Sequence, residues 1–349
     1  MRATNAVTML DPFQQRLGKW TAVLLILPAV CGEVFWTAAI LSALGTTVQI
    51  IVEIETTTVP IVVSAVVILF YTSLGGFYSV IYTDVFQVAT MTVGLWACLP
   101  YVLTHKDVGT VTGKDADWIG EVVFTDAGVA LDFFLMTALG GIPWQVYFQR
   151  VLSASSSFDA EMLSYLAALG CIILALPPIM VGAAAKTTNF TLAGYKGPFQ
   201  LRPDDVPSVL PISIRFLTPS FVNILGLGAI TSAVMSSVDS SMLSAAAMVT
   251  RNIYHELLRP TAGNVEVAAV LRASVCIIGA VSTFMALSVT SVYALWTLSS
   301  DLVYVLIFPQ LVSLFYLQPH GSVEATSTGP PKSFTHPGCS GATLLSATP

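Results

Sequence analysis

The stretch SAVMSSVDSSMLSA, from Ser232 to Ala245, carries seven hydroxyl or carboxylate side chains inside a long apolar segment. If this stretch is helical, Ser236 lies three residues before Asp239 and shares its face. Hydroxyl and carboxylate oxygens are hard ligands, which suit Na⁺ better than they suit soft metals. The stretch therefore indicates a cation site. The alternative is close helix packing, because serine and alanine let two backbones approach each other.

Two further carboxylates, Glu33 and Asp301, also lie inside apolar segments. Ionisable groups within a membrane span are costly and by default suggest a function. For these two, as for Asp239, the alternative is a structural carboxylate that is hydrogen-bonded to a neighbouring helix. The residue type alone leaves both interpretations open.

Two tryptophans lie within apolar segments: Trp36 is near the middle of the first one, and Trp144 directly follows Gly140, Gly141 and Pro143. Glycine and proline at mid-membrane discourage a continuous helix, and broken helices at this depth are tolerated where they line a cavity. Tryptophan faces bind quaternary ammonium groups by cation–π attraction. The pair indicates an aromatic cage for such a cation, with ordinary packing as the alternative.

The elements that must position these residues are membrane helices. Only 10% of the 349 residues are charged and 55% are hydrophobic, whereas an ordinary soluble domain has roughly 25% charged residues. The sequence therefore predicts an integral membrane protein surrounded by membrane lipid. Spanning segments must satisfy their backbone internally, so we expect an all-α, polytopic transmembrane helical bundle. The apolar segments of sufficient length are 20–45, 57–75, 81–104, 128–149, 160–185, 219–247, 265–289 and 293–316.

Several function classes are disfavoured. The net charge is −6 and there is no basic patch, which argues against nucleic acid as a partner. No nucleophile–base pair and no nucleotide-binding loop stand out, so we expect no enzyme and no organic cofactor. The cysteines have no metal-type spacing.

We expect three regions along the chain. Residues 1–19 form a cytoplasmic N-terminal segment, 20–316 a transmembrane domain of about eight helices, and 317–349 a disordered tail rich in Ser, Thr, Gly and Pro. This orientation puts eight Lys and Arg residues inside and six outside, a weak positive-inside signal. It also places the acceptor sequence NFT, with Asn189 as the glycosylation site, outside.

Longer strings resemble the sodium–solute symporter family, and within it the choline-transporting members. They run in the expected order from about residue 8 to about residue 315 and include GEVFWTAAILSALG, LGGFYSVIYTDV, GGIPWQVYFQRVLS, GLGAITSAVMSSVDSSMLSA and LWTLSSDLVYVLIFPQL. The resemblance implies a LeuT-like inverted-repeat fold and sodium-coupled, chloride-dependent choline uptake by alternating access, with Na⁺ and Cl⁻ as the required ions. The roles implied for single residues are sodium binding by the Ala233 carbonyl and the Ser236 and Ser237 hydroxyls, coupling by Asp239, and a choline cage containing Trp36 and Trp144.

The chain also departs from the family pattern. Three earlier spans of the family, one of them unwound and glycine-rich, have no counterpart here, and neither do its later spans. We therefore expect an incomplete fold with half a sodium site and half a cage, and impaired transport. The alternatives are a non-transporting form that associates with the full-length transporter and modulates it, or a symporter for another small solute. The resemblance implies the plasma membrane, at presynaptic terminals, and synaptic vesicle membranes of cholinergic neurons.

Overall fold

The computed structural model describes residues 6–112, 118, 120, 123–197, 201–289 and 291–317, and every regular element within them is a helix. The predicted tail, 317–349, lies outside the described residues except for Leu317. The α-helices are α1 (Asp11–Leu17), α2 (Lys19–Val52), α3 (Thr58–Leu103), α4 (Ala127–Gly140), α5 (Gln145–Ser153), α6 (Ser157–Lys186), α7 (Val209–Leu217), α8 (Ser220–Met248), α9 (Asn264–Ser288), α10 (Val292–Asp301) and α11 (Phe308–Val312). Two short 3₁₀ segments, η2 (Phe124–Asp126) and η3 (Pro203–Ser208), precede α4 and α7, and three π-helical segments, η4 (Val249–Leu258), η5 (Leu302–Ile307) and η6 (Ser313–Leu317), continue α8, α10 and α11.

Eight helices in the described residues are long and apolar enough to cross a membrane, and they match the eight predicted segments one to one. They are Lys19–Val52, Thr58–Phe77, Ser79–Leu103, Phe124–Ser153, Ser157–Lys186, Ser220–Leu258, Asn264–Ser288 and Val292–Tyr316. The predicted all-α class is confirmed. The helices extend past several predicted ends: α2 has 34 residues, about 51 Å of helix, whereas the hydrocarbon core of a bilayer is about 30 Å thick.

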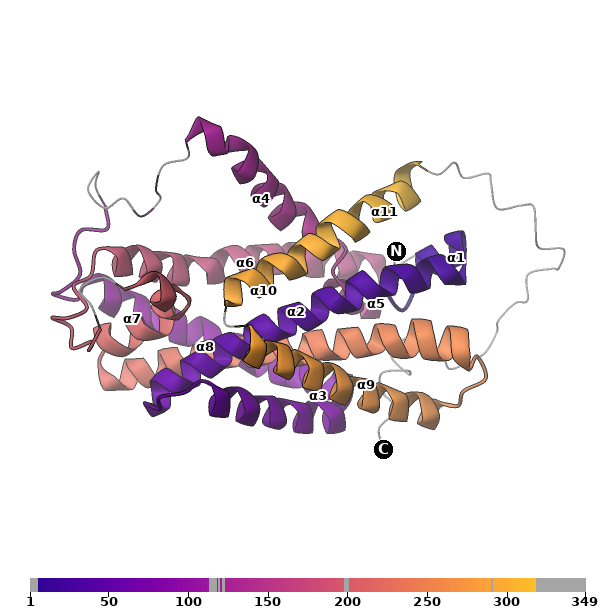
Figure 1. Ribbon diagram of the computed structural model, residues 1–349, viewed down its shortest axis with the longest axis horizontal. Helices are drawn as coiled ribbons and strands as arrows, with labels where there is room; N and C mark the ends of the chain where they lie inside the picture. Colours follow the sequence, from indigo (N-terminus) through magenta and orange to yellow (C-terminus); the bar gives the residue numbers. More distant parts are fainter. Residues whose placement is uncertain are drawn as a thin grey trace.

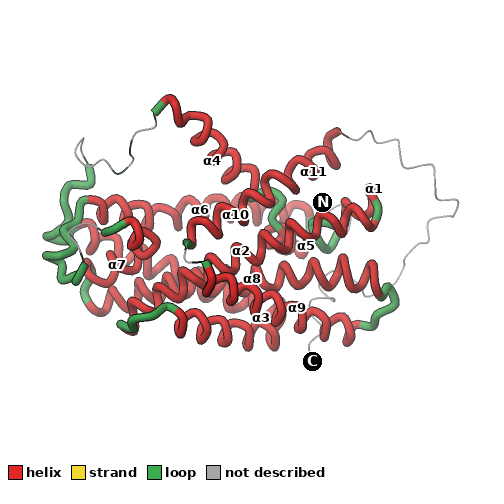
Figure 2. Tube along the Cα trace, viewed as in Figure 1, coloured by secondary structure: helices red, strands yellow, loops and turns green. Residues whose placement is uncertain are grey.

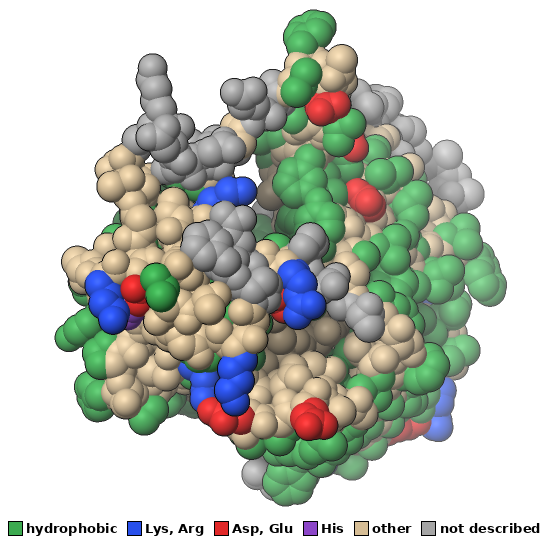
Figure 3. Space-filling view, turned by 60° about the vertical axis from the view of Figure 1, so that its left-hand side comes forward, with side chains coloured by type: hydrophobic (Ala, Val, Ile, Leu, Met, Phe, Trp, Pro, Cys, Tyr) green, Lys and Arg blue, Asp and Glu red, His purple; other side chains and the backbone are tan. Residues whose placement is uncertain are grey.

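The long helices lie side by side along the longest axis of the molecule (Figures 1 and 2). Most connecting segments gather at the end where α7 lies, and α1 lies at the opposite end. In the predicted orientation the α7 end is extracellular and the α1 end is cytoplasmic. Figure 3 shows the α7 end, where charged side chains lie among polar ones while hydrophobic side chains cover the flank. Apolar side chains on the flank are the surface that lipid requires.

One glycine divides α3 into two spans. Gly76 has φ 59° and ψ −161° within otherwise helical backbone, and this left-handed region is open to glycine at little steric cost. The sequence predicted two separate spans, 57–75 and 81–104, on either side of this point. The chain therefore reverses across the membrane here with almost no loop, which places Asp84 close to the start of the second span.

The central helix α8 packs most closely against the second half of α3. A Cβ added at Gly94 of α3 would lie 2.5 Å from the Leu225 carbonyl oxygen and 2.6 Å from the Ala229 Cβ, both on α8. Such a distance to a backbone atom cannot be relieved by moving a flexible side chain. Gly94 therefore fixes how deeply α3 and α8 approach each other, and that approach sets the position of the serine-rich face of α8.

Gly94→Ala is expected to lower the free energy of unfolding by about 1–3 kcal/mol, because overpacking forces a backbone shift. The matched control is Gly228→Ala on α8, where an added Cβ meets nothing within 4 Å. This change should stabilise the helix slightly, because alanine has a higher helix propensity than glycine. The measurement is the melting temperature of the purified protein in detergent. Equal melting temperatures for the two variants would show that the close approach is unimportant.

The N-terminal helix α1 is anchored by a buried carboxylate. Asp11 is 7% exposed, and its Oδ1 accepts hydrogen bonds from Thr8 Oγ1 at 2.6 Å and from Asn252 Nδ2 at 2.8 Å. Phe13 is fully buried in a cluster that also contains Phe148 and Ile307. The sequence indicated only a cytoplasmic segment at 1–19. The structure adds a helix, α1, that packs against η4 at the end of the molecule opposite α7.

Candidate functional site

The two predicted tryptophans meet. The ring centroids of Trp36, on α2, and Trp144 are 5.9 Å apart with an interplanar angle of 73°, the edge-to-face arrangement that aromatic pairs favour. Trp144 has extended backbone, φ −80° and ψ 126°, and directly precedes α5. The predicted break at Gly140–Pro143 therefore occurs, and it brings the Trp144 ring against α2.

This pair lines a large cavity of about 1140 Å³. The cavity continues from the tryptophans past Ser236 and Ser237 to Ala154 and Ser155, in the turn between α5 and α6. In the predicted orientation that turn is cytoplasmic, so the cavity connects the mid-membrane tryptophans to the cytoplasmic end. A volume of this size can hold a small organic solute with its hydration.

A third tryptophan, Trp296 of α10, lines the same cavity. Its ring lies 5.7 Å from the Phe133 ring of α4 and 5.7 Å from the Tyr293 ring. Sequence reasoning did not single it out, although it lies near the start of the predicted span 293–316, in the string LWTLSSDLVYVLIFPQL. The cavity is thus lined by tryptophans from three separate parts of the chain.

The predicted sodium ligands lie together on α8. The Ser237 hydroxyl donates to the Ala233 carbonyl oxygen at 3.0 Å, so these two oxygens are adjacent. Ser236 and Ser237 both line the cavity, and the Ser236 hydroxyl donates to Asp84 Oδ1 at 2.5 Å. Three oxygens on one side of a helix, next to a carboxylate, form a donor set of hard ligands suited to a small cation. Among the described residues, no group of three or more His, Cys, Asp and Glu side chains could hold a metal ion.

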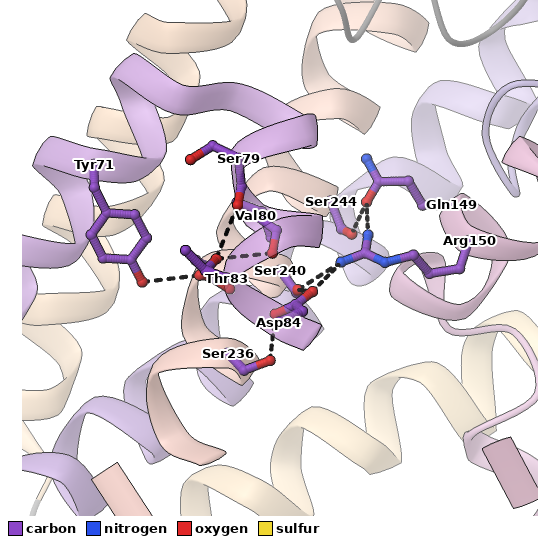
Figure 4. Close-up of polar contacts among 11 residues, drawn as sticks. Tyr71, Ser79, Val80, Thr83, Asp84, Gln149, Arg150, Ser236, Ser240 and Ser244 are labelled. Atoms are coloured by element: carbon purple, nitrogen blue, oxygen red, sulfur yellow. Dashed lines mark hydrogen bonds and ion pairs between the residues drawn. The ribbon is translucent and has the colours of Figure 1, made fainter. Parts of the chain in front are cut away.

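Asp84 is the charged centre of the site and was missed in the sequence. Its carboxylate lies between Ser236, Ser240 and Arg150 (Figure 4). Arg150 Nη2 donates to Asp84 Oδ2 at 3.0 Å and to Ser240 Oγ at 2.9 Å, and the guanidinium stands 5.1 Å from the centre of the Phe77 ring. The signal was present, since Asp84 is a carboxylate near the start of the predicted span 81–104.

Asp239 forms a contact of its own, with a neighbouring helix. It is 0% exposed, and its Oδ2 accepts a hydrogen bond from Tyr71 OH of α3 at 2.9 Å. The carboxylate therefore ties α8 to the first half of α3, on the side of Ser236. Its part in sodium coupling stays a prediction.

The other two predicted carboxylates differ from each other. Glu33 is 2% exposed, and its Oε2 is hydrogen-bonded to Ser241 of α8. Asp301, at the end of α10, is exposed and does not join the site. The glycosylation candidate, Asn189, lies in the turn after α6, where its Oδ1 accepts from the Leu192 backbone N–H at 3.2 Å.

Comparison with known proteins gives the family. Residues 1–317 match the model described as the Sodium:solute symporter family. The chain is 46% identical over 329 residues to "High-affinity choline transporter 1" of Drosophila melanogaster and 45% identical over 324 residues to "High affinity choline transporter 1" of Homo sapiens. These alignments cover 93% and 91% of this chain but 53% and 56% of the relatives, so the chain spans about half the length of the curated relatives it matches.

A solved structure supports the fold. The chain resembles a Na⁺-coupled sialic acid symporter in a substrate-bound outward-open state, with a TM-score of 0.69, 19% identity, and coverage of 82% of this chain and 62% of that chain. This likeness confirms the predicted LeuT-like helical fold, and the eight spans confirm an integral membrane protein. Because the family model matches residues 1–317 of the 349, the chain belongs to the sodium:solute symporter family.

Proposed function

We propose that this chain serves sodium-coupled uptake of choline across the plasma membrane by alternating access, with chloride as a further required ion. The observation that carries the proposal is the contact of Trp36 with Trp144 at a large cavity. Choline carries a quaternary ammonium group, which cannot donate a hydrogen bond and is instead bound by aromatic faces. The relatives named high-affinity choline transporters support choline as the solute. Their names also support transport, and not catalysis, as the activity.

Sodium binding would follow from the oxygens on α8. The Ala233 carbonyl and the Ser236 and Ser237 hydroxyls supply neutral ligands, and Asp84 supplies a negative charge 2.5 Å from the Ser236 hydroxyl. A cation bound there would take the Ser237 hydroxyl oxygen and the Ala233 carbonyl oxygen as ligands at the same time. Because Ser236, Ser237, Trp36 and Trp144 line one cavity, occupancy of the two sites would be linked through α8.

The direct test is sodium-dependent uptake of labelled choline by cells that express this 349-residue chain, with surface labelling as the control. Uptake would support the proposal and would show that the expected impairment is wrong. Surface delivery without uptake, together with retained choline binding, would support a transport-impaired chain. Lowered surface delivery of a co-expressed full-length transporter would favour the modulating role instead, and uptake of another small solute would change the substrate.

The same proposal includes two further properties of the chain. These are its location at presynaptic terminals and synaptic vesicles, and glycosylation at Asn189.

Ser237→Ala is expected to raise the sodium concentration for half-maximal choline binding about tenfold, equivalent to about 1.4 kcal/mol, because one hard ligand is lost. The measurement is choline binding against sodium at constant ionic strength. The matched control is Ser288→Ala, since the exposed Ser288 makes the same kind of hydrogen bond to the carbonyl of residue 284 at 2.8 Å. An unchanged sodium requirement for Ser237→Ala would remove this residue from the site.

A further inference from the structure

A buried carboxyl group outside the sodium ligands has no charged partner among the described residues. We propose that Glu33 is a proton-binding site and that, as a neutral acid, it joins the tryptophan pair to the serine-rich helix α8. Glu33 is 2% exposed and lies on α2 one turn before Trp36. An isolated carboxylate in an apolar interior is so costly that such groups bind a proton or a cation. The proton site itself does not depend on the proposed function.

The charged and titratable groups on the surrounding elements are engaged elsewhere or exposed. Those with other partners are Asp11 with Asn252, Arg16 with the Leu314 carbonyl, Tyr71 with Asp239, Asp84 with Arg150, and Glu266 with Tyr254 and Arg259. Arg272 of α9 and Asp301 of α10 are exposed, the Tyr304 ring of η5 stacks with Phe308, and Cys31 lies on the opposite side of α2. None of the ion pairs in the described part of the chain includes Glu33.

The hydrogen bonds around Glu33 are best satisfied with a proton on the carboxyl group. Thr37 Oγ1 donates to Ser241 Oγ at 3.0 Å, and Ser241 Oγ lies within hydrogen-bond distance of both Glu33 Oε2 and the Glu33 carbonyl oxygen. Ser241 has one hydroxyl hydrogen and two acceptor lone pairs. With an ionised carboxylate, that one hydrogen can be donated to Glu33 Oε2 or to the Glu33 carbonyl oxygen, but not fully to both. With a protonated carboxyl group, Glu33 donates to Ser241 Oγ and the Ser241 hydrogen is free for the carbonyl at 3.3 Å.

The second carboxyl oxygen and a hydrogen-bond donor, both without a partner in the described part of the chain, belong to residues that line the same small cavity. Glu33 Oε1 and Gln145 Nε2 both lack a hydrogen-bond partner among the described residues, and both residues line one small cavity together with Trp144. The cavity volume of about 10 Å³ is close to the smallest that holds one water molecule. A water there would accept from Gln145 Nε2 and donate to Glu33 Oε1, without any cation in the group.

The position of this carboxyl group means that its protonation state affects the contact between α2 and α8. Glu33 is one turn from Trp36, Gln145 directly follows Trp144, and Ser241 is one turn beyond Ser237. Loss of the proton would place a negative charge in the apolar contact between α2 and α8, which disfavours that contact. Proton occupancy of Glu33 would therefore be linked to the arrangement of the tryptophans relative to α8. This linkage, unlike the proton site, rests on the proposed function.

The experiment is infrared spectroscopy of the full 349-residue chain in detergent or lipid at neutral pH. A protonated carboxyl group gives a C=O band that is separate from the carboxylate bands and shifts in D₂O. We expect such a band in the wild type, its loss in Glu33→Gln, and its retention in the control Glu161→Gln, because Glu161 is exposed on α6. A spectrum in which Glu33→Gln removes a carboxylate band would overturn the proposal.

A second measurement separates a proton from a bound cation. Glutamine is neutral and can still donate to Ser241, so Glu33→Gln is expected to melt at the wild-type temperature and to keep any stabilisation by sodium. Glu33→Ala is expected to melt at a lower temperature. If Glu33→Gln abolished the sodium-dependent rise in melting temperature while Ser237→Ala kept it, Glu33 would be a sodium ligand and the proposal would be wrong. Failure of choline or sodium to bind the wild type would count against the proposed function and leave the infrared result valid.

Discussion

Trp144→Ala is expected to weaken choline binding roughly 30-fold or more, equivalent to about 2 kcal/mol for a desolvated cation–π contact. The ring lies 5.9 Å from that of Trp36, so its removal also deprives Trp36 of an edge-to-face partner, a contact worth about 0.5–1.5 kcal/mol. The measurement is equilibrium binding of labelled choline to the purified chain at saturating sodium. Trp144→Phe should retain part of the affinity, because a weaker aromatic face remains.

The control for this loss is Trp20→Ala. Trp20 is 74% exposed on α2, far along the same helix from Trp36, so its removal should leave choline binding unchanged. Melting temperatures separate loss of the cage from loss of the fold, because the extended backbone at Trp144 also begins α5. A Trp144→Ala variant that stays folded and binds choline as the wild type does would mean that the two rings only pack against each other.

Much of the fold follows from apolar lengths alone. Eight long, predominantly apolar segments predicted eight spans, since a segment of about 20 such residues has few other stable environments. The break at Gly140, Gly141 and Pro143 was also predictable, because residue type limits local backbone conformation. These features depend on residues that are close in the sequence, which is why they could be identified without any knowledge of helix packing.

The contacts of the site could be predicted less well, because they join residues far apart in the sequence. Asp84 and Arg150 are separated by 66 residues, and Glu33 and Ser241 by 208. Which carboxylate meets which hydroxyl depends on the crossing of α2, α3 and α8, and this crossing is set partly by close approaches such as that at Gly94. The sequence therefore identified Asp239 as polar and buried, but its partner on α3, Tyr71, could not be predicted.

Asp84→Asn is expected to produce the second large effect, on sodium dependence and on stability together. The change leaves the Arg150 guanidinium without its carboxylate, and breaking a buried pair by removing one partner costs about 3–5 kcal/mol. The Arg150 and Asp84 side chains are 23% and 21% exposed, so solvent reduces this cost, and we expect about 2 kcal/mol. The sodium concentration for half-maximal choline binding should rise more than tenfold, since the negative charge beside Ser236 is lost.

The double variant Asp84→Asn with Arg150→Gln separates the two effects. Removing both charges leaves no unpaired guanidinium, so the melting temperature should recover toward that of the wild type, and a double-mutant cycle measures the coupling. Sodium dependence should not recover, because the carboxylate is still absent. The matched control is Glu53→Gln, which removes a carboxylate paired with Arg215. Glu53 follows the last residue of α2, and its side chain is 72% exposed. Recovery of normal sodium dependence in the double variant would make Asp84 only a structural partner of Arg150, and the charge that balances sodium would then have to come from elsewhere in the site.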